Sequence, residues 1–467
     1  MDSTLQKNSL SRQIINSIRG QEEDYTLISI RKAIILLAIP MVLEMIMESV
    51  FALVDMVVVS SLGDKAISVV GITESILTII YALGLGVGMG ATGLISRRIG
   101  EKRIARASIA SCQSINLGVV LSLPVIILGL FFPAKILALM HAEPQVIEIG
   151  TSYTSIMLTG NILIMLLFIN NAIFRSAGNP ALSFRVLFIA NLINIILDPC
   201  LVFGWSFFPE MGVKGAAVAT NIGRGIGVIY QFYMLFSGKG TIKIKLSYFK
   251  VKLITMWKVL YLSAGGILQF VIATSSWILL YRILATYGSS VIAGYTIAIR
   301  AFVFFLLPAW GLSNAASTLV GQNLGAKNPQ RAEKSVWYTA IVNLAYMLLV
   351  FILFEVFTHS VIRVFQTTND SFPIAVHSLR IISYGLLFYG LGMVMAQAFN
   401  GAGDTFTPTL INFIGFWILE LPLAYYLSHK AGMGADGVFY SVLIAESFIA
   451  ILGILLFLRG KWKLREL

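Results

Sequence analysis

Twelve long apolar segments, separated by short polar connectors, make up most of this chain of 467 residues. Hydrophobic residues account for 57% of the sequence and charged residues for 12%, whereas soluble domains carry about 25% charged residues. Most segments exceed the roughly 20 residues that a helix needs to cross a membrane. They cover 33–60, 66–96, 108–132, 146–174, 181–203, 213–236, 259–287, 290–320, 335–358, 374–399, 407–428 and 436–458. The sequence therefore predicts an all-α polytopic membrane protein with twelve transmembrane helices.

The basic residues predict how these segments are oriented. The net charge is +12, and Lys and Arg gather near both termini and in the connectors after the second, fourth, sixth and eighth segments. Connectors rich in Lys and Arg stay in the cytoplasm. We therefore expect an integral protein of a prokaryotic cytoplasmic (inner) membrane, with both termini cytoplasmic. Because topology explains the charge, the charge does not point to a nucleic-acid partner.

The two halves of the sequence repeat one pattern. Corresponding residues keep their order, and they include Gly63 with Gly288, Gly100 with Gly325, Gly178 with Gly403 and Asp198 with Glu420. Six segments in each half make the second half enter the membrane in the same direction as the first, which predicts two six-helix lobes related by a parallel repeat. The expected parts are a cytoplasmic tail at 1–32, an N-terminal lobe at 33–238, a basic cytoplasmic linker at 239–258, a C-terminal lobe at 259–458 and a cytoplasmic tail at 459–467.

Acidic residues inside the first segment are the strongest functional signal. A charged side chain at the centre of a membrane helix costs about 2.5–3.5 kcal/mol on insertion scales, so it faces a partner or water and marks a functional site by default. Glu44, Glu48 and Asp55 lie within about 40° of one another on a helix and form one stripe. The stripe must face the bundle. A structural role is the stronger alternative for Glu44, which lies nearer the basic residues Arg31 and Lys32.

The fifth segment carries a second polar face. Asn191, Asn194 and Asp198 are spaced three, four and seven residues apart, so they share one side of a helix. Their oxygens suit a hard cation such as Na⁺, and the carboxylate suits a proton. A ladder of interhelical hydrogen bonds is the alternative. Pro199 follows at once, and we expect it to break the helix there.

Other chemistry finds no support in the sequence. Cys112 and Cys200 fall inside predicted spans and indicate neither a disulfide framework nor a metal centre. The glycine-rich stretch 84–93 follows no strand and ends in no Gly-Lys-Ser/Thr, so it does not predict a nucleotide site. We expect no enzyme activity and no cofactor. Glu420 in the second half remains a secondary candidate site residue, as do Glu44, Glu48 and Asn191.

Four passages together make the chain resemble the multidrug and toxic compound extrusion (MATE) family. They are 53–63 at the end of the first segment, 90–100 with its echo at 318–325, 174–199 around the fourth and fifth segments, and 212–220. The resemblance implies a V-shaped fold of twelve helices. It also implies export of amphipathic organic cations in exchange for inward flow of Na⁺ or H⁺.

The same resemblance suggests where the coupling ion binds. In the DinF-like prokaryotic branch the ion site uses positions that match Asp55, Asn194, Asp198 and Thr220 in this sequence. The glutamate of the seventh segment in the NorM-like branch is replaced by Gln269. The DinF-like branch is therefore favoured, and Na⁺ or H⁺ is expected at the four N-terminal positions.

The function expected from these features is secondary active antiport by alternating access. The expected partners are a small amphipathic substrate and membrane lipid, without nucleic acid or nucleotide, and the expected oligomeric state is a monomer. The main alternative is a flippase for lipid-linked oligosaccharides, which would line its cavity with basic residues such as Arg224, Arg282 and Arg300. A channel or receptor is a third reading, but the chain has no soluble domain.

Overall fold

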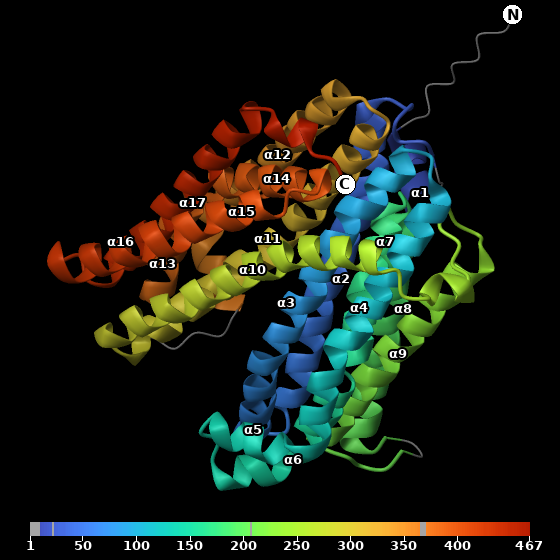
Figure 1. The fold of residues 1–467 in the computed structure, drawn as a ribbon. Coiled ribbons are helices and arrows are strands. Elements are labelled where there is room, and N and C mark those ends of the chain that lie inside the picture. The colour runs from blue at the N-terminus through green and yellow to red at the C-terminus, as the bar shows by residue number, and fades with distance from the viewer. Residues whose placement is uncertain (1–9, 21–22, 206–207, 365–369) are drawn as a thin grey trace, which may run out of the picture.

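The computed structural model describes residues 10–20, 23–205, 208–364 and 370–467. Within these ranges all regular structure is helical (Figure 1). Ten helices in the described part are long and apolar enough to cross a membrane, and a bent helix pair makes an eleventh. These agree with the predicted all-α membrane fold. Residues 1–9 and 21–22 of the predicted N-terminal tail lie outside the described residues.

The N-terminal half contains nine helices in its described residues. They are α1 (Leu10–Ile18), α2 (Ile30–Ser60), α3 (Asp64–Gly100), α4 (Ile104–Phe131), α5 (Pro133–Leu139), α6 (Pro144–Thr159), α7 (Asn161–Ser176), α8 (Pro180–Phe203) and α9 (Val213–Ser237). The segment predicted at 146–174 is one membrane span, built from two helices, α6 and α7, that meet at Gly160. Helix α9 corresponds to the predicted segment 213–236. It packs on α6, α7 and α8 but is more polar than the apolar spans, since it carries Asn221, Arg224 and Gln231.

The C-terminal half repeats this organisation. Its elements are α10 (Leu253–Leu284), α11 (Ser289–Gly325), α12 (Pro329–Val364), α13 (Phe372–Ser383), α14 (Leu386–Ala402), α15 (Phe406–Asn412), a π-helical stretch (Phe413–Glu420), α16 (Leu421–Tyr425), a second π-helical stretch (Tyr426–Lys430) and α17 (Ala435–Leu458). Helices α13 and α14 form one span bent by 55°. Helix α10 begins six residues before the segment predicted at 259, because the residues from Leu253 are mostly apolar and continue the helix.

Two bundles diverge from the end of the molecule where the termini lie (Figure 1). We call helices α2–α9 the N-lobe and α10–α17 the C-lobe. Each lobe has its own apolar core. Contacts between the lobes are most extensive where α10 packs on α3 and where α11 packs on both α2 and α3. The two lobes form a V whose open side faces away from the termini.

Glycines allow α3 and α10 to approach each other closely. A Cβ on Gly266 would lie 2.8 Å from the carbonyl oxygen of Gly86, and a Cβ on Gly90 would lie 2.6 Å from the backbone nitrogen of Ser263. Real Cβ atoms do not come so close, so only glycine fits at this crossing. The crossing joins the N-lobe to the C-lobe at the narrow part of the V.

The segment before α2 closes the end of the V where the termini lie. The hydroxyl of Tyr25 donates to the carbonyl oxygen of Gly178 in the N-lobe at 2.7 Å. Arg331 of the C-lobe donates to the carbonyl oxygen of Tyr25 at 3.0 Å and also to that of Ile28. Lys102 forms an ion pair with Asp24. This segment therefore contacts both lobes and holds them together at one end.

Candidate functional site

The two polar faces predicted from the sequence meet inside the N-lobe. Helix α2 packs against α8, and the stripe on α2 faces inward as its charge requires. Asn191 of α8 donates to the carbonyl oxygen of Met47 on α2 at 2.7 Å. Glu44, Asn191, Asn194 and Asp198 are all at most 5% exposed. The face on α8 and the Glu44 end of the stripe on α2 are thus buried between helices.

Asp198 lies among oxygens that have no partner. Asn194 donates through its Nδ2 to the hydroxyl of Thr220 on α9 at 3.2 Å. The Oδ1 of Asn194 and both carboxylate oxygens of Asp198 are buried and accept no hydrogen bond from any described residue. Buried polar atoms are normally paired, so three unpaired oxygens on adjacent turns of α8 indicate that a bound species belongs there.

Pro199 does not break α8, contrary to the prediction. The helix continues to Phe203 and ends at Gly204, whose φ of 72° is left-handed. A proline lacks the N–H that would bond four residues back, so Pro199 withholds that bond from the carbonyl oxygen of Ile195. The helix stays continuous, but the carbonyl oxygen of Ile195, about one turn from Asp198, receives no hydrogen bond from Pro199.

Asp55 joins this group from α2. It is half-buried, and its carboxylate is close enough to Asp198 for the two charges to repel each other. It also lies within electrostatic range of Arg224. The structure thus brings the four predicted residues Asp55, Asn194, Asp198 and Thr220 into one region of the N-lobe.

Arg224 on α9 is a buried cation of this region, which the sequence suggested only as a basic residue of a flippase cavity. It donates to the hydroxyl of Tyr81 at 3.3 Å, and its guanidinium lies 5.1 Å from the ring centre of Phe51. It is 7% exposed and attracts Glu48 and Glu74 electrostatically. Glu74 is a carboxylate inside the apolar segment 66–96, so the rule that identified Asp55 could have identified it as well.

A small cavity lies between these side chains. Its volume is about 10 Å³, the scale of a single water molecule. Polar side chains from α2, α8 and α9 line it, namely Glu48, Asn191, Asn194, Thr220 and Arg224. The region therefore has room for one water or one small ion next to Asn194 and Thr220.

Glu44 belongs to a different network. Its Oε1 accepts from Arg175 at 2.5 Å and from Asn171 at 3.1 Å. Asn171 in turn accepts a hydrogen bond from Gln231 at 2.7 Å. The acidic stripe of α2 thus has a paired end at Glu44 and a second end at Asp55, which lies near the unpaired oxygens of Asp198.

The secondary candidate Glu420 lies in the other lobe. It ends the π-helical stretch, is fully buried, and accepts a hydrogen bond from Ser276 at 2.7 Å, while its Oε1 has no partner in the described chain. Single π-helical turns are frequent at functional sites. Gln269 is occupied by hydrogen bonds to Asn400 and to the carbonyl oxygen of Thr405.

The side chains of Asp55, Asn194, Asp198 and Thr220 suit a monovalent cation. Among the described residues, no group of three or more His, Cys, Asp or Glu side chains is placed to hold a metal ion. A Na⁺ ion there would use two carboxylates together with amide and hydroxyl oxygens, and a proton would need one carboxylate alone.

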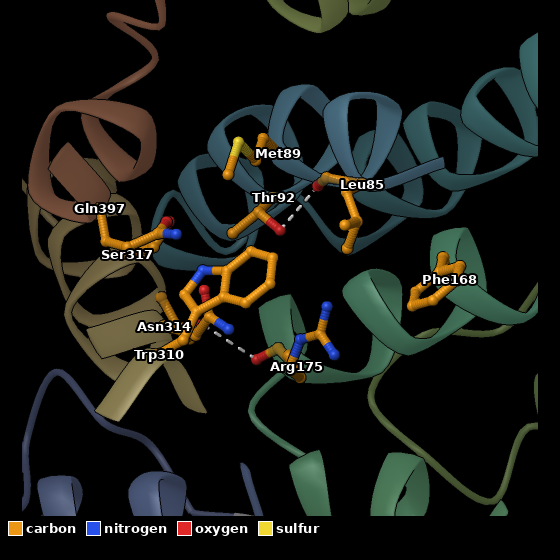
Figure 2. A pocket seen from close by; sticks show the side chains of 11 residues that line it. Leu85, Met89, Thr92, Phe168, Arg175, Trp310, Asn314, Ser317 and Gln397 are labelled. Atoms are coloured by element: carbon orange, nitrogen blue, oxygen red, sulfur yellow. Dashed lines mark hydrogen bonds between the residues drawn. The ribbon is translucent and has the colours of Figure 1, made fainter. Parts of the chain in front are cut away.

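A second pocket lies where the lobes meet. Figure 2 shows Trp310 and Asn314 of α11 facing Arg175 of α7, with Met89 and Thr92 of α3 on the other side of the indole. The hydroxyl of Thr318 in the C-lobe donates to the carbonyl oxygen of Arg175 at 3.2 Å. The residue that pairs with Glu44 therefore also borders the space between the lobes.

Comparisons with known proteins agree with this architecture. The sequence profile of the MatE family matches residues 40–200 and again residues 266–426, once in each half. The chain is 26% identical over 436 residues to the probable multidrug resistance protein NorM of Thermotoga maritima, covering 93% of this chain and 94% of that protein. It is 26% identical over 428 residues to the multidrug export protein MepA of Staphylococcus aureus, covering 91% and 93%.

The fold is shared with solved structures. An outward-facing multidrug resistance MATE family transporter of the MOP superfamily superposes with a TM-score of 0.87 at 24% identity, over 94% of this chain and 97% of that one. Since the family profile covers more than half of the sequence, the chain belongs to the MatE family, whose members are transporters and not enzymes.

Proposed function

We propose that this protein is a secondary active multidrug exporter that exchanges amphipathic organic compounds for H⁺ or Na⁺. The names of the relatives NorM and MepA support multidrug export. The observation that carries the coupling is the unpaired state of Asp198. Its two buried oxygens lie near Asp55 and one helical turn from Asn194, which donates to Thr220.

Binding of one cation changes the electrostatics of the N-lobe. Without it, Asp55 and Asp198 repel each other, and Arg224 is shared with Glu48 and Glu74. A proton on either aspartate, or a Na⁺ between them, removes that repulsion and lets α2 pack more closely on α8. An ion drives a conformational change only if it binds one state better than the other, and closer packing of α2 provides that difference.

The conformation described above suits the outward-open step of this cycle. The lobes are joined at the end with the termini and spread at the other end (Figure 1). With both termini in the cytoplasm, as the basic connectors predict, the open side faces outward. The coupling cation then enters from outside, the drug leaves, and the lobes rock back around the α3–α10 crossing. A monomer is sufficient for this cycle.

Efflux from proteoliposomes tests the proposal. The wild-type chain should export a fluorescent cationic drug under an imposed Na⁺ gradient, an imposed pH gradient, or both. Asp198→Asn and Asp55→Asn should each reduce gradient-driven efflux to the rate of empty vesicles. Asp64→Asn is the matched control, because Asp64 is an exposed residue in the first turn of α3. Efflux at the wild-type rate in both site variants would refute the coupling.

A further inference from the structure

The basic segment 239–258, which joins the two lobes, is held in place by the N-lobe. It follows α9, runs into the first turns of α10, and is the yellow-green stretch between their labels in Figure 1. The fully buried Gln113 of α4 donates to the carbonyl oxygens of Tyr248 and Lys250, each at 3.0 Å. It also accepts from the backbone nitrogen of Lys252 at 3.1 Å. One buried side chain thus fixes the backbone of this segment at three points.

The fixed backbone directs lysine side chains away from the N-lobe. Ile242 and Ile244 are buried in the N-lobe core, and the lysines that alternate with them are exposed. Successive side chains of an extended backbone point to opposite sides, so burial of the isoleucines turns the lysines outward. Two more exposed lysines lie on the stretch that Gln113 holds. We call these four residues the linker lysines: Lys243, Lys245, Lys250 and Lys252.

No acidic side chain neutralises the linker lysines. The sequence 239–258 contains six lysines and neither Asp nor Glu. The ion pairs formed among the described residues include none of the linker lysines. Membrane topology accounts for lysines in this connector, but it does not require that their backbone be fixed. The surface therefore carries a fixed positive charge that is available to an anionic partner.

Large apolar side chains lie among the linker lysines along the chain and are as exposed as they are. Leu246, Val251, Leu253, Ile254 and Trp257 are each at least 61% exposed. The last three open α10, which continues as an apolar helix long enough to cross a membrane. Tryptophan is enriched where membrane meets water, and lysine keeps its charge at the headgroups while its stem lies along apolar surface. Lysines mixed with such residues are typical of a segment that lies in the membrane interface.

We propose that this segment binds anionic phospholipid, with the linker lysines on the headgroup phosphates and Leu253, Ile254 and Trp257 at the boundary with the acyl chains. The leaflet is the one on the side of the linker, which the basic connectors make cytoplasmic. A zwitterionic lipid neutralises its own phosphate and gains less from uncompensated lysines. The exposed apolar side chains favour a lipid over a soluble anion. This inference depends on the membrane-spanning fold and not on the exported substrate.

Native mass spectrometry of the purified full-length chain tests the site by titration with phosphatidylglycerol, or with phosphatidylcholine of the same acyl chains. One lysine near an anionic membrane surface contributes about 1 kcal/mol, or about fivefold in affinity. Lys250→Gln combined with Lys252→Gln should therefore weaken binding of the first phosphatidylglycerol at least about tenfold and leave phosphatidylcholine unaffected. Lys250→Arg with Lys252→Arg keeps both charges and should bind as wild type. Arg459→Gln with Lys461→Gln is the matched control, because it removes two exposed basic residues near the C-terminus.

The outcomes separate a linker site from general attraction to basic loops. Equal affinity of the wild-type chain for the two lipids, or wild-type affinity in the glutamine variant at 250 and 252, would overturn the proposal. An equal loss in the control variant at 459 and 461 would also overturn it, because any basic surface would then serve. Saturable binding of glycerol phosphate, which lacks acyl chains, at the same concentrations would assign the lysines to a soluble anion instead. Asp198→Asn should bind phosphatidylglycerol as wild type does, so its loss of efflux is a separate result.

Discussion

The ion pair between Glu44 and Arg175 gives a sharp prediction about stability. The carboxylate of Glu44 is 1% exposed, and its Oε1 accepts from Arg175 at 2.5 Å and from Asn171 at 3.1 Å, while Oε2 has no partner among the described residues. Arg175→Met leaves this buried charge with a single neutral hydrogen bond. Removing one member of a buried pair typically costs about 3–5 kcal/mol.

The other substitutions at this ion pair should lower the free energy of unfolding by less. Glu44→Gln keeps an acceptor for Arg175, whose side chain is 13% exposed and so retains some hydration. We expect a loss of about 1–3 kcal/mol for that variant. Replacing both residues, as Glu44→Leu with Arg175→Met, removes the charges together, and such replacements are often neutral. The double variant should therefore lose far less stability than the separate losses at the two sites, about 4–8 kcal/mol together, would predict.

Equilibrium unfolding in mixed micelles of dodecylmaltoside and sodium dodecyl sulfate measures these differences. Arg282→Met is the control, since it removes an exposed arginine from α10. Equal stability of Arg175→Met and the control, or a double variant as unstable as the sum of the single ones, would contradict a buried structural pair. Glu44 would then return as a candidate for the coupling site.

Three further predictions follow from the geometry. A Cβ on Gly86 would lie 2.5 Å from a backbone nitrogen of α10, so Gly86→Ala should lower unfolding stability by about 1–3 kcal/mol; Gly71→Ala, whose Cβ meets nothing within 4 Å, should not. Burial of Asp24 acts to raise its pKa, but hydrogen bonds, first among them that from Lys102, hold the pKa below its usual value. The Asp24–Lys102 pair should therefore add about 0.2–1 kcal/mol to the free energy of unfolding at pH 7, as is usual for such a partly exposed pair. That contribution should disappear as the pH falls below about 4, so the unfolding free energies of wild type and Asp24→Asn should converge across that range. Thr220→Val should slow ion-coupled efflux, whereas Thr220→Ser, which keeps the hydroxyl, should restore it; equal rates would exclude the hydroxyl as a ligand.

Most of the fold was predictable because it follows from apolar length. The segment predicted at 181–203 differs from α8 by one residue at its start, and Pro180 explains that start because proline favours the first turn of a helix. The break between α6 and α7 was not predictable. It occurs at Gly160, where the side chain of Asn221 occupies the space that a Cβ would need. That contact depends on where α9 packs, which no local pattern records.

The candidate site, like the fold, was predictable from the sequence only in part. Asp55 and Asp198 stand out because a carboxylate in an apolar run is costly wherever it points. The hydrogen bond between Asn194 and Thr220 depends on how α8 and α9 pack, and the family resemblance rather than the spacing paired those positions. The contact between Arg224 and Tyr81 joins α9 to α3 and could not be read from either segment. The aromatic side chains that line a cavity in the C-lobe likewise come from separate helices, each of which resembles an ordinary apolar span.

The repeat places a corresponding buried acid in each lobe. Asp198 and Glu420 correspond in the two halves, and each is fully buried with at least one unpaired oxygen. Their surroundings differ. Asp198 lies one helical turn from Asn194, which lines a cavity of about 10 Å³. Glu420 lies within electrostatic range of Glu446, which lines an aromatic cavity of about 360 Å³. A small ion gains most from close oxygens, and a bulky organic cation gains most from aromatic surface beside a charge. Duplication of one buried acid, followed by divergence of the side chains around it, is thus sufficient to give the two lobes different surroundings for a ligand.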